Sequence, residues 1–496
     1  MTMRRSTVFV LLLLLTAALA VPGGAAIGQP GGSAAAAAAA SAASDFDNDG
    51  FADLAIGVPG ENDFAGAVNV LYGSGGGLTG TGAQVFTGVG GGPIVGEFGS
   101  ALAAGDFDND GFADLAAGAR FRTVAGAQAA GSVGVLYGSG GGLTTTGGQL
   151  FTQVGGADEQ SDQFGAALAA GDFNNDGFDD LAAGASGENV AARPGAGAVS
   201  ILYGSSNGLT AGGGQLFTQV GGAVESGDEF AAALAAGDFD NDGFADLAAG
   251  APGEDVGGVP SAGAVSILYG SGGGLTTAGG QLFTQVGGAV EGGDVFGWAL
   301  ATGDFNQNGF ADLAVGAPFE DVGGAELAGA VSVLYGSGGG LSTAGGRLFT
   351  QVAGAVEDTD LFGSAVAGGD LNDDGFDDLI AGAPWEDVGS VALAGTVSVI
   401  RGSASGLTTA GGQRINQVGG TVEVDDQFGA EVGTGDFDND GITDLAAGAP
   451  AEDISNSTFN AGAMSASGRL FTQNSPGVPG TAEDFDSFGG NAFNAG

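Results

Sequence analysis

The chain has 496 residues, of which 106 are Gly, and it carries 58 Asp and Glu against nine Arg and no Lys. A formal net charge of −49 at pH 7 excludes a nucleic-acid groove, because the phosphate backbone would be repelled. Since the chain has neither Cys nor His, disulfides, thiolate zinc sites, cysteine nucleophiles and Ser-His-Asp catalysis are excluded as well.

The first 20 residues have the pattern of a secretory signal peptide. Arg4 and Arg5 precede an apolar run over 8–20, and the run ends in a small-x-small cleavage pattern. The run is too short to span a bilayer comfortably, and a retained membrane anchor is the alternative. Residues 21–44 are rich in Gly, Pro, Ser and Ala and predict a flexible leader. We therefore expect a secreted, extracellular or cell-surface protein with no transmembrane anchor after cleavage.

From residue 45 onward an acidic motif returns seven times, the first interval being 61 residues and the next five 66 each. Within one repeat, for example 230–286, four short strands are joined by Gly-rich turns, and there is no helical periodicity. A four-stranded sheet of this size cannot bury both faces alone. Residues 45–496 therefore predict an all-β fold, a seven-bladed β-propeller of four-stranded antiparallel sheets, which we expect to be monomeric. The Ala- and Gly-rich first strands suit the crowded axis of such a ring.

The end of the chain resembles a first strand without the loop that follows it elsewhere. Residues 488–496 are similar to 98–105, which lead into an acidic loop, whereas the first repeat begins at Asp45 without such a strand. We therefore predict that the C-terminal strand completes the first blade and closes the ring, with an open solenoid as the alternative. The last repeat is shortened around its outer hairpin, so its third strand, within 463–467, is expected to be short or irregular.

Each acidic motif reads Asp-x-Asp/Asn-x-Asp/Asn-Gly-x-x-Asp. Positions 1, 3, 5 and 9 offer side-chain oxygens, position 7 offers its carbonyl, and Gly at position 6 allows a sharp turn with positive φ. Calcium prefers such a set of hard oxygen ligands, and an EF-hand is excluded because position 12 is never Glu and the flanks are strands. The predicted ligands of up to seven Ca²⁺ ions are Asp45, Asp47, Asp49, Phe51, Asp53; Asp106, Asp108, Asp110, Phe112, Asp114; Asp172, Asn174, Asp176, Phe178, Asp180; Asp238, Asp240, Asp242, Phe244, Asp246; Asp304, Asn306, Asn308, Phe310, Asp312; Asp370, Asn372, Asp374, Phe376, Asp378; Asp436, Asp438, Asp440, Ile442 and Asp444.

The seven loops differ in charge. Those beginning at residues 45, 106, 238 and 436 have four ligating carboxylates, those at 172 and 370 have three, and the 304 loop has only Asp304 and Asp312. Fewer ligand charges weaken calcium binding, so we expect the weakest site at the 304 loop.

The repeats are similar to the FG-GAP repeat family, which forms the N-terminal propeller of integrin α-subunits. The likeness covers residues 45–496 and departs from the pattern at Ala231, Arg120 and Ser186. Phe-Gly pairs precede the acidic loops at 98–99, 164–165, 296–297, 362–363 and 428–429, and Gly-Ala-Pro follows them at 250–252, 316–318, 382–384 and 448–450. The resemblance implies calcium in the loops and adhesion-like binding. Nothing in the chain resembles the integrin leg domains, the transmembrane helix or an inserted domain.

The expected function is that of a calcium-binding scaffold for adhesion to an unidentified extracellular protein or glycan, and not that of an enzyme. Acidic pairs such as Glu254-Asp255 and Glu320-Asp321 repeat in phase on the face opposite the calcium loops, together with the aromatic Trp385. They suggest an acidic face for a basic protein or, through cations, a glycan, and the alternative is a solvated rim with locally packed aromatics. Two other functions stay open: a calcium-dependent glycan-active hydrolase with carboxylates in the axial channel, and a calcium-stiffened structural envelope protein.

Overall fold

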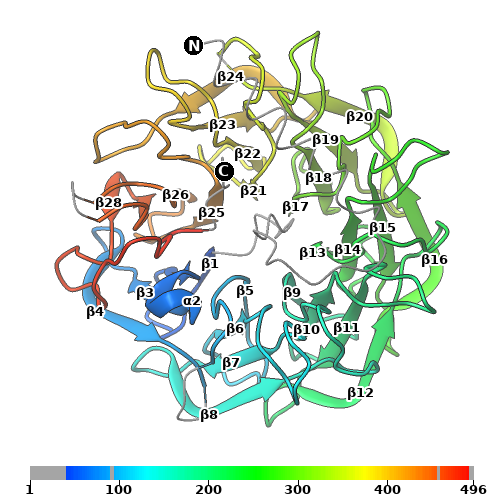
Figure 1. Cartoon of the computed structure of the whole chain (residues 1–496), viewed down its shortest axis with the longest axis horizontal. Helices are drawn as coiled ribbons and strands as arrows, with labels where there is room; N and C mark the ends of the chain where they lie inside the picture. The colour runs from blue at the N-terminus through cyan, green and yellow to red at the C-terminus, as the bar shows by residue number, and fades with distance from the viewer. Residues whose placement is uncertain (1–40, 90–93, 353, 455–457, 491–496) are drawn as a thin grey trace.

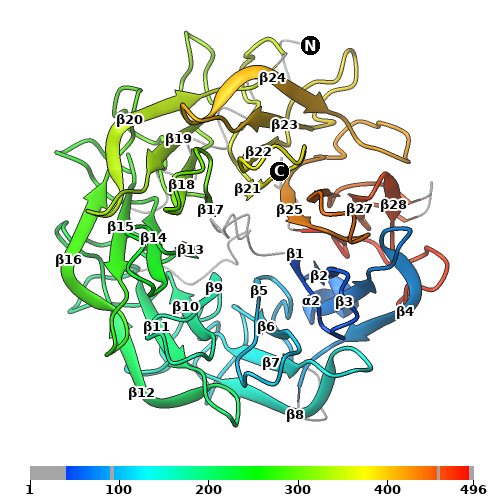
Figure 2. The same ribbon diagram turned by 180° about the vertical axis from the view of Figure 1, so that it is seen from behind.

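The computed structural model describes residues 41–89, 94–352, 354–454 and 458–490, which form seven four-stranded antiparallel sheets. The sheets are arranged as blades around one axis, and the chain runs once round the ring, so that the first and last blades lie side by side (Figures 1 and 2). The predicted all-β, seven-bladed propeller is confirmed. Among the described residues, no helix is both long and apolar enough to cross a membrane.

Within each blade the strands follow sequence order from the axis outward. The first blade contains β1 (Ser41–Ser44), β2 (Asp53–Val58), β3 (Ala67–Tyr72) and β4 (Thr79–Phe86), with one short turn, α2 (Glu61–Phe64), between β2 and β3. The next blades are β5 (Leu102–Gly105), β6 (Asp114–Gly118), β7 (Val133–Tyr137), β8 (Thr144–Phe151); β9 (Leu168–Gly171), β10 (Asp180–Ala185), β11 (Ala198–Tyr203), β12 (Thr210–Phe217); and β13 (Ala233–Gly237), β14 (Asp246–Ala251), β15 (Ala264–Tyr269), β16 (Thr276–Phe283). The last three are β17 (Leu300–Gly303), β18 (Asp312–Ala317), β19 (Ala330–Tyr335), β20 (Ser342–Phe349); β21 (Val366–Gly369), β22 (Asp378–Ala383), β23 (Thr396–Arg401), β24 (Thr408–Ile415); and β25 (Glu431–Gly435), β26 (Asp444–Ala449), β27 (Ala463–Ala466), β28 (Arg469–Phe471).

Burial explains the composition of the strands. The second strand of a blade, for example β14, is buried along its whole length because sheets cover both of its faces, and it reads as a continuous apolar run. The innermost strands contact those of the neighbouring blades, as β1 contacts β5 and β25, and their Ala and Gly residues allow this close approach.

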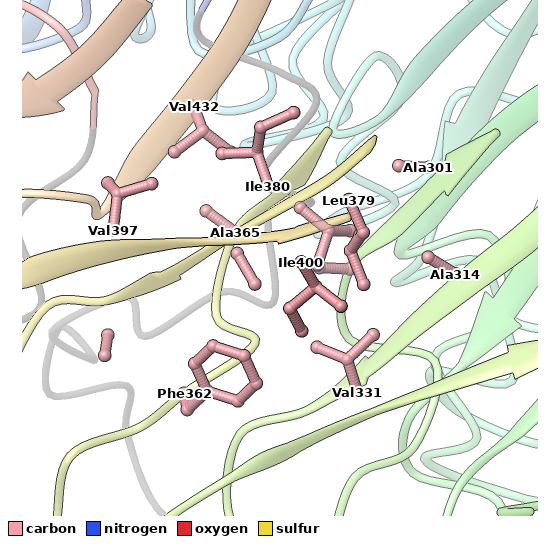
Figure 3. Close-up of a cluster of buried hydrophobic side chains, with 14 of the residues drawn as sticks. Ala301, Ala314, Val331, Phe362, Ala365, Leu379, Ile380, Val397, Ile400 and Val432 are labelled. Carbon is pink, nitrogen blue, oxygen red and sulfur yellow. The ribbon is translucent and has the colours of Figure 1, made fainter. Parts of the chain in front are cut away.

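The core lies between the blades. Phe362 of a Phe-Gly pair is fully buried and belongs to one cluster with Val331 of β19, Leu379 of β22, Ile400 of β23 and Val432 of β25 (Figure 3). Side chains from three successive blades thus share one core. Each blade is therefore stabilised by the apolar surface that it buries against its neighbours.

The inner strand of the first blade differs from the expectation. Ser41–Ser44 forms β1 and pairs antiparallel with β2, from Ser44 opposite Asp53 to Ser41 opposite Ile56. The end of the expected flexible leader is therefore part of the propeller, and the strand paired with β2 is not the C-terminal one. An Ala- and Ser-rich segment has the small residues that the axis requires, which is why composition alone did not distinguish it from a linker.

The chain end nevertheless returns to the first blade. The amide of Gly489 donates a hydrogen bond to the carbonyl oxygen of Gly57 at 3.2 Å, as the amide of Gly99 does to Gly118 within the second blade at 2.8 Å. Residues 491–496, the remainder of the expected closing strand, lie outside the described residues, as do 1–40 with the predicted signal peptide.

The last blade is shortened as expected. Its outer strands β27 and β28 have four and three residues and are joined by Ser467 and Gly468. These two residues have φ of 47° and 70°, the left-handed values that a tight two-residue hairpin turn requires.

Candidate metal sites in the acidic loops

Each acidic loop joins the first and second strands of its blade, and the Asp at position 9 begins the second strand. The Gly at position 6 has φ between 85° and 93° in all seven loops, which confirms the expected sharp turn: Gly50, Gly111, Gly177, Gly243, Gly309, Gly375 and Gly441. The residue at position 4 also has a left-handed backbone, which the sequence analysis did not predict, although Asn favours this region. These residues have φ between 54° and 58°: Asn48, Asn109, Asn175, Asn241, Gln307, Asp373 and Asn439.

The first Asp of each loop organises the turn. In the first loop, Oδ1 of Asp45 accepts a hydrogen bond from the amide of Asp49 at 3.0 Å, and Oδ2 accepts one from the amide of Gly50 at 2.8 Å. The amide of Phe51 donates to Oδ1 of Asp49 at 3.1 Å, so positions 5 and 7 lie next to each other. The same three bonds occur in each of the other six loops.

The Asp at position 9 fastens the loop to the blade. Asp53 is 1% exposed, and its two oxygens accept hydrogen bonds from the amides of Phe46 at 2.8 Å and Gly73 at 2.9 Å. Removal from water raises the pKa of Asp53 to about 7, and the charges of Asp47 and Asp45 add to the shift. A cation among these carboxylates would oppose both effects, because an opposite charge favours the ionised form.

Three carboxylates converge in four of the loops, with ligand oxygens that all lie within 4.8 Å of one another. The groups are Asp45, Asp47, Asp53; Asp106, Asp108, Asp114; Asp238, Asp240, Asp246; and Asp436, Asp438, Asp440. These are the four loops that carry four carboxylates. The converging carboxylates are at positions 1, 3 and 9 in the loops that begin at residues 45, 106 and 238, and at positions 1, 3 and 5 in the loop that begins at residue 436. The position 5 carboxylate of the first three stays exposed and bound to the amide at position 7. Such a set of hard oxygens could hold a calcium ion.

The 304 loop satisfies its carboxylates with amides. The Nδ2 group of Asn306 donates to both oxygens of Asp312, at 3.3 and 3.0 Å, and Nδ2 of Asn308 donates to the carbonyl oxygen of Gly336 at 3.3 Å. In this orientation of the two Asn amides, donors lie where a cation would need acceptors, and rotation of an amide would present its oxygen instead. That this site is the weakest stays a prediction.

The 370 loop contains a positive charge that the sequence analysis missed. The guanidinium of Arg401 pairs with the buried carboxylate of Asp378, and Nδ2 of Asn372 lies 3.5 Å from the same oxygen. The signal was available, because Arg401 ends β23 where five other blades have Tyr at the end of the third strand. Its positive charge would oppose the binding of a cation at this loop.

The seven loops are linked into a closed ring of main-chain hydrogen bonds. The carbonyl oxygen of Asp45 accepts a bond from the amide of Ala113 in the next loop at 3.1 Å, and the last loop closes on the first through Ala52 and Asp436 at 3.0 Å. The other five links are Asp179 to Asp106, Ala245 to Asp172, Ala311 to Asp238, Asp377 to Asp304 and Thr443 to Asp370, at 3.0 to 3.3 Å. A change in one loop therefore acts directly on the contact between two blades.

The acidic face expected opposite the loops is only partly on the surface. Asp255 and Asp321 are exposed, but Glu254 and Glu320, their neighbours in sequence, are only 6% and 4% exposed. Trp385 is 6% exposed as well. Phe319 and Trp298 pack together with ring centroids 5.5 Å apart. The alternative of locally packed aromatics therefore describes these residues better than an aromatic recognition surface.

Comparison with known proteins identifies the repeat. The FG-GAP repeat profile matches seven segments of the chain, at residues 36–71, 98–136, 164–202, 230–268, 296–334, 362–400 and 428–463. The chain belongs to the FG-GAP repeat family. The departures at Ala231, Arg120 and Ser186 lie inside matched segments and leave the strands in place.

Relatives of this FG-GAP chain include both an enzyme and integrin α-chains. Over 239 residues it is 31% identical to phosphatidylinositol-glycan-specific phospholipase D of Bos taurus, covering 46% of this chain and 27% of the relative. Over 251 residues it is 35% identical to integrin alpha pat-2 of Caenorhabditis briggsae, covering 47% of this chain and 19% of the relative. Among solved structures, BBS1N in complex with ARL6DN aligns with a TM-score of 0.42 at 10% identity, covering 82% of this chain and 88% of that one. The chain thus spans less than a third of the length of the two curated relatives.

Proposed function

We propose that this FG-GAP propeller is a secreted, calcium-stiffened scaffold that binds an extracellular protein or glycan. The observation that carries the proposal is the convergence of three carboxylates within 4.8 Å in each of four loops, all of them part of one hydrogen-bonded ring. Divalent cations there would remove the repulsion between like charges and stiffen the contacts between blades. The integrin relative supports an extracellular binding role for the repeat.

A binding role is favoured over catalysis because the chain lacks the usual catalytic groups and its loop carboxylates already have partners. There is no His or Cys, and both oxygens of position 1 and position 9 carboxylates bind backbone amides in the first loop. A glycosidase needs one carboxyl group that protonates a leaving oxygen and a second that faces the sugar. Since the chain covers only 27% of the phospholipase D relative, that enzyme's activity is not carried over to this chain.

The test is calcium-dependent capture of a defined partner. The purified chain is applied to an array of extracellular glycans and to extracellular proteins with basic surfaces, in excess Ca²⁺ and in EDTA, with hydrolysis products measured in parallel. The scaffold proposal expects retention in Ca²⁺, loss in EDTA and no new products. Turnover of a glycan that depends on Ca²⁺ would overturn it in favour of the hydrolase, and identical capture in both buffers would remove calcium from the account.

A further inference from the structure

A second set of buried carboxylates lies away from the loops, where the outer strand of one blade leads into the next. Six of the seven junctions contain the same three residues. They are a Gln two residues after the outer strand, an Asp two residues before the Phe of the Phe-Gly position, and a Glu three residues past the second strand of the next blade. At one junction they are Gln219, Asp228 and Glu254, which are 7%, 1% and 6% exposed. The six Asp residues are Asp162, Asp228, Asp294, Asp360, Asp426 and Asp486. We call each set a junction triad.

The three residues of a triad come from different connections and converge. Nε2 of Gln153 donates to Oε2 of Glu188 at 3.0 Å, and Nε2 of Gln417 donates to Oε2 of Glu452 at 2.9 Å. One oxygen of the Asp accepts a bond from the amide three residues before it, as Asp294 does from Glu291 at 2.8 Å. The triads are thus held together by the backbone and by the Gln side chain.

Several polar atoms aimed into the triads lack a hydrogen-bond partner. A buried amide oxygen without a hydrogen-bond partner occurs in all six triads, on Gln153, Gln219, Gln285, Gln351, Gln417 and Gln473. Oε2 of Glu254, Glu320 and Glu386 is buried without a partner as well, so these orphan oxygens are also present in the triad that Arg414 contacts. A Cβ built on Gly222 would lie 2.7 Å from Nε2 of Gln219 and 3.1 Å from Oε1 of Glu254, so the two side chains end at the same place. A buried carboxylate oxygen and a buried amide oxygen without donors favour a cation as their missing partner.

The chain itself supplies a positive charge to one triad. Nη2 of Arg414, on β24, lies 2.6 Å from Oε1 of Glu386. A Cβ built on Gly354, the counterpart of Gly222, would lie 2.8 Å from Nη1 of Arg414 and 3.2 Å from Oε1 of Gln351. The guanidinium of Arg414 therefore contacts the carboxylate of its triad directly. In the Gln219 triad the charge of Arg193 acts on Asp228, but no ion pair between them is formed among the described residues. At the same strand register, opposite the third strand, the other six blades carry Val85, Leu150, Leu216, Leu282, Leu348 and Leu470.

The seventh junction, between the first and second blades, has lost all three residues together. Gly88, Gly96 and Arg122 stand where the other junctions have Gln, Asp and Glu. Retention of the complete set at six junctions and its complete loss at one indicates that the three residues act as one unit. A solvated acidic rim would not require such coordination.

We propose that five of the six junction triads bind a hard divalent cation of the calcium class through the Asp and Glu carboxylates and the Gln carbonyl oxygen, and that Arg414 takes the place of the ion in the sixth. Two carboxylates match the charge of a divalent ion, and rotation of the Gln amide presents its oxygen. Burial and repulsion between the acids raise the pKa of Glu188 to about 6, as expected for carboxylates that lack a counter-ion. These sites are distinct from the acidic loops, and their existence does not depend on calcium binding there.

The test exchanges the residue at one strand position and counts bound ions. Calcium per chain is measured by equilibrium dialysis and elemental analysis at pH 7.5 for the natural chain, Arg414→Leu, Leu282→Arg and Leu150→Arg. Arg414→Leu should gain one ion, because its triad loses the built-in charge, and Leu282→Arg should lose one. Leu150→Arg makes the same chemical change at the junction without a triad and should leave the count unchanged. The loops are identical in all four proteins, so the differences do not depend on how many loops bind.

Two results would overturn the inference. The first is an unchanged count in both Arg414→Leu and Leu282→Arg when the two variants keep the native circular dichroism. The second is an infrared band of protonated carboxyl groups at pH 7.5 that becomes weaker in Glu254→Gln but does not change when calcium is added. Such a band would mean that Asp228 and Glu254 share a proton instead of an ion. If Leu282→Arg fails to fold, Glu254→Gln keeps the triad's shape, and it should itself lose one ion.

Discussion

The guanidinium of Arg401 pairs with a carboxylate that a cation in the 370 loop would need, so replacing Arg401 with Gln should strengthen any calcium binding there. Arg401 pairs with Asp378, whose side chain is fully buried, while the Arg401 side chain itself is 15% exposed. The substitution removes the positive charge and leaves the buried carboxylate without its partner. The variant should therefore lose stability in the absence of calcium and recover it when calcium is added.

The size of both effects can be worked from the pair. At an effective dielectric constant of about 20, a unit charge and a divalent ion about 4 Å apart repel by about 8 kcal/mol. Because Arg401 can swing into solvent and relieve most of this repulsion, we expect a gain in affinity of about tenfold or more, which is about 1.4 kcal/mol. Breaking a buried ion pair costs about 3–5 kcal/mol, which the partial exposure of Arg401 reduces to about 2 kcal/mol. For a chain of this length, about 2 kcal/mol corresponds to a shift of about 2 °C in Tm.

The assay is calorimetric calcium titration together with thermal melts in EDTA and in Ca²⁺. Arg401→Gln should bind calcium more tightly at one site and melt about 2 °C lower in EDTA but not in saturating Ca²⁺. Arg401→Lys keeps the charge and should resemble the natural chain in the titration. If Arg401→Gln loses stability equally in both buffers, with unchanged calcium affinity, the charge of Arg401 does not compete with an ion and the reasoning is refuted.

Two further predictions concern charge and pH. In a chelator titration, the 304 loop should release its ion before the other loops. Replacing Asn306 with Asp adds a carboxylate and removes the donor to Asp312, so the 304 loop should then release its ion later. Release of ions from the four-carboxylate loops before the 304 loop of the natural chain would contradict the charge ranking. Burial and the neighbouring acids raise the pKa of Glu188 to about 6 and of Asp486 to about 6. Their contribution to stability is thus present below the unfolded-state pKa and lost as pH rises through about 6. Urea unfolding of the calcium-free chain should show falling stability from pH 5 to pH 7, and Glu188→Gln should flatten the fall.

Much of the fold follows from the repeat, because a period of 66 residues with four short strands can bury its faces only by packing blade on blade. The repeat did not reveal which segment of the chain forms the innermost strand of the first blade. Ser41–Ser44 and the C-terminal segment both have the small residues that fit the axis, so composition could not decide between them. Pairing with β2 depends on where the chain travels in space.

The sequence predicted that acidic residues of each loop converge, whereas the amide and guanidinium groups that contact them were missed; metal binding by these residues stays a prediction. The spacing of Asp45, Asp47 and Asp53 places their oxygens in one loop, and local geometry alone brings them together. Arg401 ends β23 beside Asp378 at the start of β22, 23 residues earlier in the chain, so the acidic motif itself does not contain it. The burial of Glu254 was missed for the same reason, because Gln219 and Asp228 come from other connections and an acidic dipeptide in isolation suggests a solvated rim.

The central claim is that divalent ions in the acidic loops hold neighbouring blades together. When the free calcium concentration is one hundred times the Kd of a site, binding at that site adds about 2.7 kcal/mol to the free energy of unfolding. Four convergent loops would therefore add about 11 kcal/mol, which is comparable to the whole stability of many folded proteins. The most direct test is to measure the Tm and the radius of gyration of one preparation in excess Ca²⁺ and in excess EDTA. We predict a large fall in Tm and an expanded or partly unfolded chain in EDTA; an equally compact chain with an unchanged Tm would contradict the account.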